Sequence, residues 1–298
     1  MELFQYKQLK EPDTDLRLLK IKSVTPEGVH CSLSVISSRR KRPIVYNALS
    51  YTWGDESLKS RIIVNDKAFY VTFNLELALR NLETSKHYWI DAICINQVDL
   101  EERNHQIQRM RDIYKSAQTV IVWLGRDHEP EDEELWFRRD IWGFERLGKG
   151  NSETTARAFN LLKDLSLVGN LIFTAQSGYS SRLIDSTLRS LETQSWAALA
   201  RFFKRAWFER LWVIQELESA HKAVVQCMGF RADWHSVVFA AATILRPPQH
   251  LTSVIPHRFL PYLGAERIQN IALQGDKSNI LDVLRQTKEA KCKDPRDR

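Results

Sequence analysis

A regular alternation of helical and strand-like segments between residues 74 and 125 constrains the fold more than any other feature of the sequence. In the helical segments apolar residues recur every three or four positions, which is the spacing of one face of a helix. The strand-like segments are short and almost continuously apolar, as strands buried on both faces are. In chain order the segments are a helix that Asn74 can cap, the strand 88–95, a helix over 100–117 that Asp99 and Glu102 can cap, and the strand 119–125. This order predicts a parallel sheet with helices packed on it.

Strand-like patterns also precede this core. Apolar and polar residues alternate over 16–22, with a one-residue phase slip, and again over 29–35, so we expect an amino-terminal β-ribbon whose first strand is bulged. The apolar and aromatic run 45–53 predicts a buried strand that ends in a tight turn at Gly54 and Asp55. Two β-rich arms within 61–71 predict a small hairpin.

The alternation stops after residue 125 and resumes near residue 196. Residues 126–195 open with an acidic run and carry mixed helical patches, so they are interpreted as a largely helical insertion. A helical stretch over 196–220, interrupted near Lys204, precedes a strand at 223–227 and a helix at 234–245. We therefore predict one domain with these parts: the ribbon 1–45, an α/β core of 46–125 and 196–245, the insertion 126–195, and a helical extension 246–298.

Composition excludes several classes of protein. With 43% hydrophobic residues in 298, the chain can bury a real core, so wholesale disorder is excluded. No run of about 18 apolar residues predicts a membrane span, and the amino end lacks the pattern of a secretory signal, so we expect a cytoplasmic protein. The net charge of +6 is modest, and the basic run 39–43 is offset by the acidic run 129–134, which disfavours nucleic-acid binding.

Metal, disulfide and common nucleotide-binding chemistries also lack support. The four cysteines lie far apart without a CxxC pair, and the histidines form no HxxxH pair, so we expect reduced thiols and no metal site. Neither a Walker-type phosphate loop nor a spaced-glycine dinucleotide fingerprint is present. Cys94 has apolar neighbours and no histidine close in sequence, which favours a buried structural thiol over a nucleophile.

Five short segments stand out in chain order: Tyr46–Gly54 (YNALSYTWG), Trp89–Gln97 (WIDAICINQ), Glu102–Ile107 (ERNHQI), Val122–Gly125 (VWLG) and Arg210–Glu216 (RLWVIQE). Together they resemble the successive blocks of the fungal HET (heterokaryon incompatibility) domain family. The closing residues 294–298 resemble the start of a further block, so we expect the family sequence to continue beyond Arg298.

The resemblance implies a fungal cytosolic module that triggers cell death when genetically unlike hyphae fuse, under an upstream sensor domain or protein. Two segments are similar, more distantly, to TIR domains. The turn Ser50–Glu56 is similar to the first strand and loop of a plant-type TIR domain, and Trp212–Leu217 is similar to the segment that carries the catalytic glutamate of NAD-cleaving TIR enzymes. This similarity implies a TIR-like, flavodoxin-like sheet, NAD or a related nucleotide as substrate, no separate cofactor, homo-oligomerisation on activation, and Glu216 as the catalytic residue.

The residues around Glu216 allow two interpretations. If the segment is helical, Glu216 shares a face with Trp212 and, two turns earlier, with Glu209, and its helical neighbours include no cation. A carboxylate in such a setting fits a site acid. Alternatively, Glu216 caps a helix or pairs with an arginine from elsewhere in the fold.

Other candidate binding residues follow the predicted strands. Ligands of open parallel sheets sit outside the carboxyl ends of the strands. Side chains that can bind ribose, phosphate or a flat ring near these ends are Tyr51, Trp53, Gly54, Asp55, Asp91, Asn96, Gln97, Arg103 and Trp212. For Asp91 and Asn96 the alternative is loop fixation through bonds to the backbone, and for Trp53 it is core packing.

Two classes of function therefore remain open. One is an enzyme that cleaves the nicotinamide–ribose bond of NAD. The other is a non-enzymatic signalling module that acts by self-assembly or by recruiting a partner, for which Trp136 and Trp142 on the insertion would supply an apolar surface.

Overall fold

The structure is a computed structural model that describes residues 1–37, 44–126, 152–173, 193–210, 212–218 and 220–245. Contacts divide the chain into two compact units, one of residues 1–125 with 212–224 and one of residues 126–211 with 225–298. Several predictions concern residues outside the described ranges. They are those for the basic run 39–43, the acidic run 129–134, Trp136, Trp142 and the extension 246–298.

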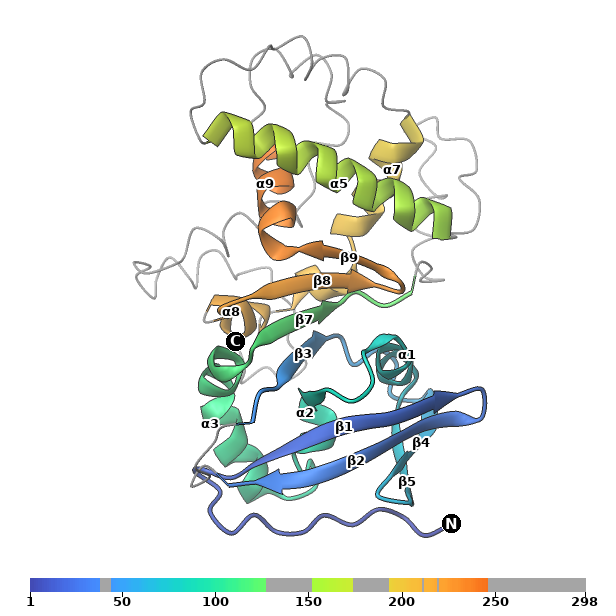
Figure 1. Cartoon of the computed structure of the whole chain (residues 1–298), viewed down its shortest axis with the longest axis vertical. Coiled ribbons are helices and arrows are strands. Elements are labelled where there is room, and N and C mark those ends of the chain that lie inside the picture. The colour runs from blue at the N-terminus through green and yellow to red at the C-terminus, as the bar shows by residue number, and fades with distance from the viewer. Residues whose placement is uncertain (38–43, 127–151, 174–192, 211, 219, 246–298) are drawn as a thin grey trace. The chain divides into compact units, whose positions relative to one another are not determined.

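The first unit is a mixed sheet with helices on both faces (Figure 1). Its strands are β1 (Leu16–Thr25), β2 (Gly28–Ile36), β3 (Asn47–Tyr51), β4 (Lys59–Val64), β5 (Lys67–Thr72), β6 (His87–Trp89) and β7 (Thr119–Trp123). Its helices are α1 (Phe73–Asn81), α2 (Asp91–Cys94), α3 (Leu100–Ser116) and α8 (Val213–Glu218). The strands are ordered β5-β4-β2-β1-β6-β3-β7, and the start of β8 (Ala223–Cys227) follows β7. The predicted α/β fold with a parallel core sheet flanked by helices is confirmed, because β3 runs parallel to both β6 and β7.

The amino-terminal ribbon and the hairpin form as predicted. β1 pairs antiparallel with β2, and the register shifts between Ile21 and Ser23, which is the expected bulge. β4 and β5 pair antiparallel around a two-residue turn at Asn65 and Asp66, whose φ angles are 51° and 63°. Asn and Asp tolerate positive φ, which a type I′ turn requires at both central residues. The twist of this turn matches the twist of the two strands.

The order of the three parallel strands contains a reversal. The chain forms β3 first, crosses to β6 on one side, and then crosses to β7 on the other side of β3. Right-handed crossovers in opposite directions place their helices on opposite faces, and Figure 1 shows α1 and α3 on opposite sides of β3. The carboxyl ends of β3 and β7 therefore form a topological switch point, where open sheets bind ligands.

The predicted strand 88–95 is wrong beyond its first residues. β6 ends at Trp89, and Asp91 begins the short helix α2, in which the backbone N–H of Cys94 donates to the carbonyl of Ile90 at 2.7 Å. Ile90, Ile93 and Cys94 are all buried. A buried helical turn and a buried strand are both apolar on every side, so periodicity over so short a run does not distinguish them.

Two predicted helix caps have different outcomes. Asn74 is not a cap, because it lies inside α1, whose N-cap is Thr72. Asp99 is the N-cap of α3, and its carboxylate accepts from the N–H groups of Glu101 and Glu102. The Glu102 side chain accepts instead from the N–H of Asn96 at 2.7 Å. Tertiary contacts thus replace the second half of the capping box.

The second unit contains the helices and the hairpin that follow the core. Its described elements are α5 (Ser152–Phe173), α7 (Thr193–Phe203), the 3₁₀ turn η1 (Ala206–Glu209), the later part of β8, β9 (Phe230–Asp233) and α9 (Trp234–Leu245). The helix break near Lys204, the strand 223–227 and the helix 234–245 are confirmed. A Cβ at Gly169 of α5 would lie 2.9 Å from the carbonyl of Phe239, so a glycine lets α5 approach α9 closely.

Candidate functional site

Glu216 lies on α8 and is buried against β3. It is 1% exposed, and the hydroxyl of Ser50, itself 0% exposed, donates a hydrogen bond to its Oε2. The backbone N–H of Glu216 donates to the carbonyl of Trp212 at 3.1 Å, which holds the first turn of the helix. The structure therefore brings together a carboxylate and a hydroxyl that are 166 residues apart in the sequence.

The local sequence explains why α8 packs at this place. Ser50 lies two residues after Ala48 on β3, so both side chains point to the same face of the sheet. α3 covers that face, where the rings of Tyr114 and Trp89 meet edge-to-face at 5.5 Å and the Tyr114 hydroxyl donates to the carbonyl of Leu49. α8 packs beside α3, and Arg111 of α3 lies 3.8 Å from the carboxylate of Glu218.

The helix around Glu216 is shorter than the predicted helical stretch that ends at residue 220. α8 begins at Val213, whereas Glu209 belongs to η1, so Glu209 and Glu216 do not share a helix face. Trp212 directly precedes α8 and is half-buried.

A second group of predicted residues meets at the carboxyl ends of β3 and β6. The indole Nε1 of Trp53 donates to Asp91 Oδ2 at 3.0 Å, and Asp91 Oδ1 accepts from the N–H of Ala92 at 2.7 Å. Gln97 Nε2 donates to the carbonyl of Asp91 at 3.0 Å. Asp91 thus links the loop after β3 to the loop after β6, as expected if its role is to fix these loops. It also orients the Trp53 ring.

Gly54 and Asp55 shape the turn after β3. Gly54 has a φ of 75°, and a Cβ there would lie 3.3 Å from the Cβ of Asn74. The Asn74 amide donates to the carbonyl of Thr52 at 2.7 Å and accepts from Trp123 Nε1 at 3.1 Å, so it ties the ends of β3 and β7 together. Asp55 is exposed, and hydrogen bonds from Ser57 lower the pKa of its carboxyl group.

Asn96 and Arg103 are half-buried beside this edge. The backbone N–H of Asn96 donates to Glu102, while its side-chain Oδ1 is buried without a hydrogen-bond partner. Arg103 lies in the first turn of α3, and no residue in the described ranges pairs with its guanidinium. Both side chains have polar atoms that a ligand could engage.

Tyr51 lies apart from Glu216. It follows Ser50 on β3, and consecutive strand residues point to opposite faces of a sheet. Tyr51 is in register with Trp123 of β7, on the face that α1 covers. The predicted residues therefore divide between the Ser50 face, the opposite face and the carboxyl edge of the sheet.

Comparison with known proteins identifies the family. The family described as Heterokaryon incompatibility protein (HET) matches residues 46–216, which is more than half of the chain. The chain belongs to the HET family. All five resembling blocks fall on elements described above: β3 and its turn, β6 with α2, α3, β7, and the segment that ends in α8.

One curated relative matches the chain over part of its own length. The chain is 29% identical over 269 residues to "Heterokaryon incompatibility protein 6, OR allele" from Neurospora crassa, a match that covers 82% of the chain and 38% of the relative. The chain thus spans well under half the length of that relative. No solved structure matches the chain.

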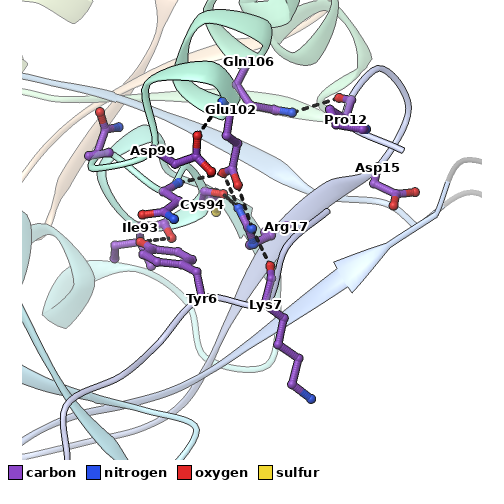
Figure 2. Close-up of polar contacts among 12 residues, drawn as sticks. Tyr6, Lys7, Pro12, Asp15, Arg17, Ile93, Cys94, Asp99, Glu102 and Gln106 are labelled. Atoms are coloured by element: carbon purple, nitrogen blue, oxygen red, sulfur yellow. Dashed lines mark hydrogen bonds and ion pairs between the residues drawn. The ribbon is translucent and has the colours of Figure 1, made fainter. Parts of the chain in front are cut away.

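Sequence reasoning missed a buried polar network of the first unit that centres on Arg17 (Figure 2). The Arg17 guanidinium pairs with both carboxylate oxygens of Glu102 and donates to the carbonyls of Cys94 and Lys7. Its centre lies 4.9 Å from the ring of Tyr6, whose hydroxyl donates to the carbonyl of Ile93 at 2.9 Å. The alternation over 16–22 predicts an outward Arg17, and no local pattern identifies a partner 85 residues away.

The described cysteines are buried and are set apart from the candidate site residues by their structural character. The described cysteines, Cys31, Cys94 and Cys227, are free and buried, and burial raises the pKa of the Cys94 thiol to about 12, as expected for a structural thiol. Within the described ranges, no group of three or more His, Cys, Asp or Glu side chains could hold a metal ion. In the same ranges, every helix is too short or too polar to cross a membrane.

Proposed function

We propose that this chain triggers regulated cell death in nonself recognition, and that it does so by hydrolysing the nicotinamide–ribose bond of NAD. The first part rests on membership of the HET family and on the relative named heterokaryon incompatibility protein 6. The proposal places the protein in the cytoplasm, under an upstream sensor domain or protein. Glu216 is the proposed catalytic residue.

The observation that carries the enzymatic proposal is the Glu216 carboxylate, held by the Ser50 hydroxyl next to the carboxyl end of β3. Isolated carboxylates are rarely buried, because transfer from water costs several kcal/mol unless hydrogen bonds or charges compensate. Buried carboxylates beside a switch point of an open sheet are candidates for a site acid.

The chemistry needs a carboxylate but no separate acid. The bond between the ribose C1′ and the nicotinamide nitrogen breaks, and its electron pair goes to nicotinamide, which leaves as a neutral molecule. The ribose becomes oxocarbenium-like, and Glu216 stabilises this charge and binds the ribose hydroxyls. Water then adds at C1′ and loses a proton, so that NAD and water yield nicotinamide, ADP-ribose and H⁺.

Residues at the sheet edge supply the proposed binding groups. Trp53, oriented by Asp91, or Trp212 stacks on a flat ring of the substrate. Asn96, Gln97 and Arg103 position ribose or phosphate. Because Glu216 is 1% exposed, the active form must uncover it, and self-association on activation is the proposed cause.

The test is nicotinamide release from NAD by the full chain and by two variants. Glu216→Gln removes the charge at constant size and should lower the rate by more than about 100-fold. Glu218→Gln, two residues along α8 on its exposed side, is the matched control and should leave the rate unchanged. Undiminished hydrolysis by Glu216→Gln, or no hydrolysis by the wild-type chain under any assembly condition, would overturn the enzymatic proposal.

A non-enzymatic module is the second candidate, and an exposed apolar stripe favours it. Val98, Leu100 and Ile107 are 88%, 62% and 37% exposed, and Leu100 and Ile107 lie two turns apart on α3. Exposed apolar groups of this kind serve association. The test replaces Val98, Leu100 and Ile107 together by serine. If this triple variant abolishes cell death while Glu216→Gln retains it, the non-enzymatic signalling module is the correct class.

A further inference from the structure

We infer that Ser50 is a positioning residue of the proposed reaction, because its hydroxyl holds the Glu216 carboxylate in one orientation. This inference rests on the proposed function. Ser50 lies inside a resembling sequence block, but its position in that block assigns it no role, and the contact with Glu216 is visible only in the fold.

Ser50 lies on a buried strand that is paired on both sides. All five residues of β3 are buried, and Ser50 itself is 0% exposed. β3 pairs with β6 on one side and along its whole length with β7 on the other, where Ser50 is in register with Val122. The serine side chain has one rotatable bond before its oxygen, so the donor has little freedom.

Glu216, in contrast, is on a helix of six residues and has a side chain with three rotatable bonds. A carboxylate that stabilises a developing positive charge must be held within about 0.5 Å of its productive position. The hydrogen bond from Ser50 supplies such a restraint on the carboxylate.

The kinetic consequence follows from the position of Ser50. Since Ser50 acts through Glu216 and does not touch substrate, Ser50→Ala should lower kcat about tenfold and leave KM near the wild-type value. Ser50→Thr retains a hydroxyl and should recover most of the loss. Once Glu216 is Gln, Ser50→Ala should cause no further loss of kcat, because the two residues act as one unit.

The experiment measures kcat, KM and Tm for the full chain with NAD as substrate. Thr72→Val is the matched control, since Thr72 carries a buried hydroxyl of the same unit that has no hydrogen-bond partner. We expect Thr72→Val to keep the wild-type kcat. If Ser50→Thr fails to fold, the test rests on the double variant Ser50→Ala with Glu216→Gln, whose kcat is compared with that of Glu216→Gln alone.

Each outcome separates this inference from the proposed function. Wild-type kcat and KM in Ser50→Ala, together with loss of activity in Glu216→Gln, overturn the role of Ser50 and leave the proposed function standing. If Ser50→Ala and Thr72→Val lose kcat equally and in proportion to their loss of Tm, the Ser50 hydroxyl is structural, and the inference is also overturned. Hydrolysis that survives Glu216→Gln overturns the proposed function and this inference with it.

Discussion

Three buried carboxylates of the first unit differ in how far away their partners lie in the sequence. Glu76 pairs with Arg80 one helical turn later, an arrangement that spacing alone predicts. Glu102 pairs with Arg17, and Glu216 accepts from Ser50, across 85 and 166 residues. A residue's type and local spacing therefore indicate its chemistry only when its partner is also local.

Cys94 offers a direct test at this scale. Burial raises the pKa of its thiol to about 12, as it does for Cys31, so the thiolate fraction at pH 8 is far below that of an ordinary cysteine, whose pKa is about 8.5. We expect both thiols to resist iodoacetamide at pH 8 in the native chain and to react after unfolding in guanidinium. Peptide mass spectrometry resolves each site, and native labelling of Cys94 at the unfolded rate would contradict the burial.

At the scale of elements, the β4–β5 hairpin combines a local and a tertiary determinant in two adjacent residues. Asn65 and Asp66 both adopt positive φ, as the turn type requires. Asn65 has a second function: its Oδ1 accepts from the N–H of Leu33 at 3.1 Å, and its Nδ2 donates to the carbonyl of Leu33 at 2.9 Å. The turn therefore also docks the hairpin on β2.

The two glycine variants of this turn should differ in stability. Glycine accepts positive φ at either position, so Asp66→Gly should change the free energy of unfolding by no more than a few tenths of a kcal/mol. Asn65→Gly should lose about 1–2 kcal/mol, because it removes two hydrogen bonds. Urea denaturation measures both, and equal stabilities would show that the contacts with Leu33 contribute nothing.

On the largest scale, the amino-terminal segment joins distant parts of the first unit. Ala68 of β5 exchanges backbone hydrogen bonds with the carbonyl of Glu2 and the N–H of Phe4. Farther along, Pro12 accepts from Gln106 and Arg109 of α3. Arg17 donates to the carbonyls of Lys7 in this segment and of Cys94 in α2, and it pairs with Glu102 of α3. One buried pair therefore joins the segment, α2 and α3.

Removing the Arg17 charge should therefore destabilise the chain strongly. Arg17→Met leaves the Glu102 carboxylate buried without its cation, which typically costs about 3–5 kcal/mol. The double variant Arg17→Met with Glu102→Met should recover part of this loss, whereas Lys22→Met, at an exposed position of β1, should have little effect. Urea denaturation compares the three, and a mild effect of Arg17→Met would show that the pair is dispensable.

Local patterns along the chain predict most of the described elements, their order and the family, because each pattern lies within one short segment. Alternation predicts the ribbon and its bulge, the apolar runs predict β3 and β7, and Asp99 begins α3. The fold was needed to show that residues 91–94 form a helix, that Asn74 ties the ends of β3 and β7, and that Arg17 is buried. The same holds for the contact between Ser50 and Glu216. Periodicity reports how each residue meets its immediate surroundings, whereas a hydrogen bond between distant residues depends on the path of the whole chain between them.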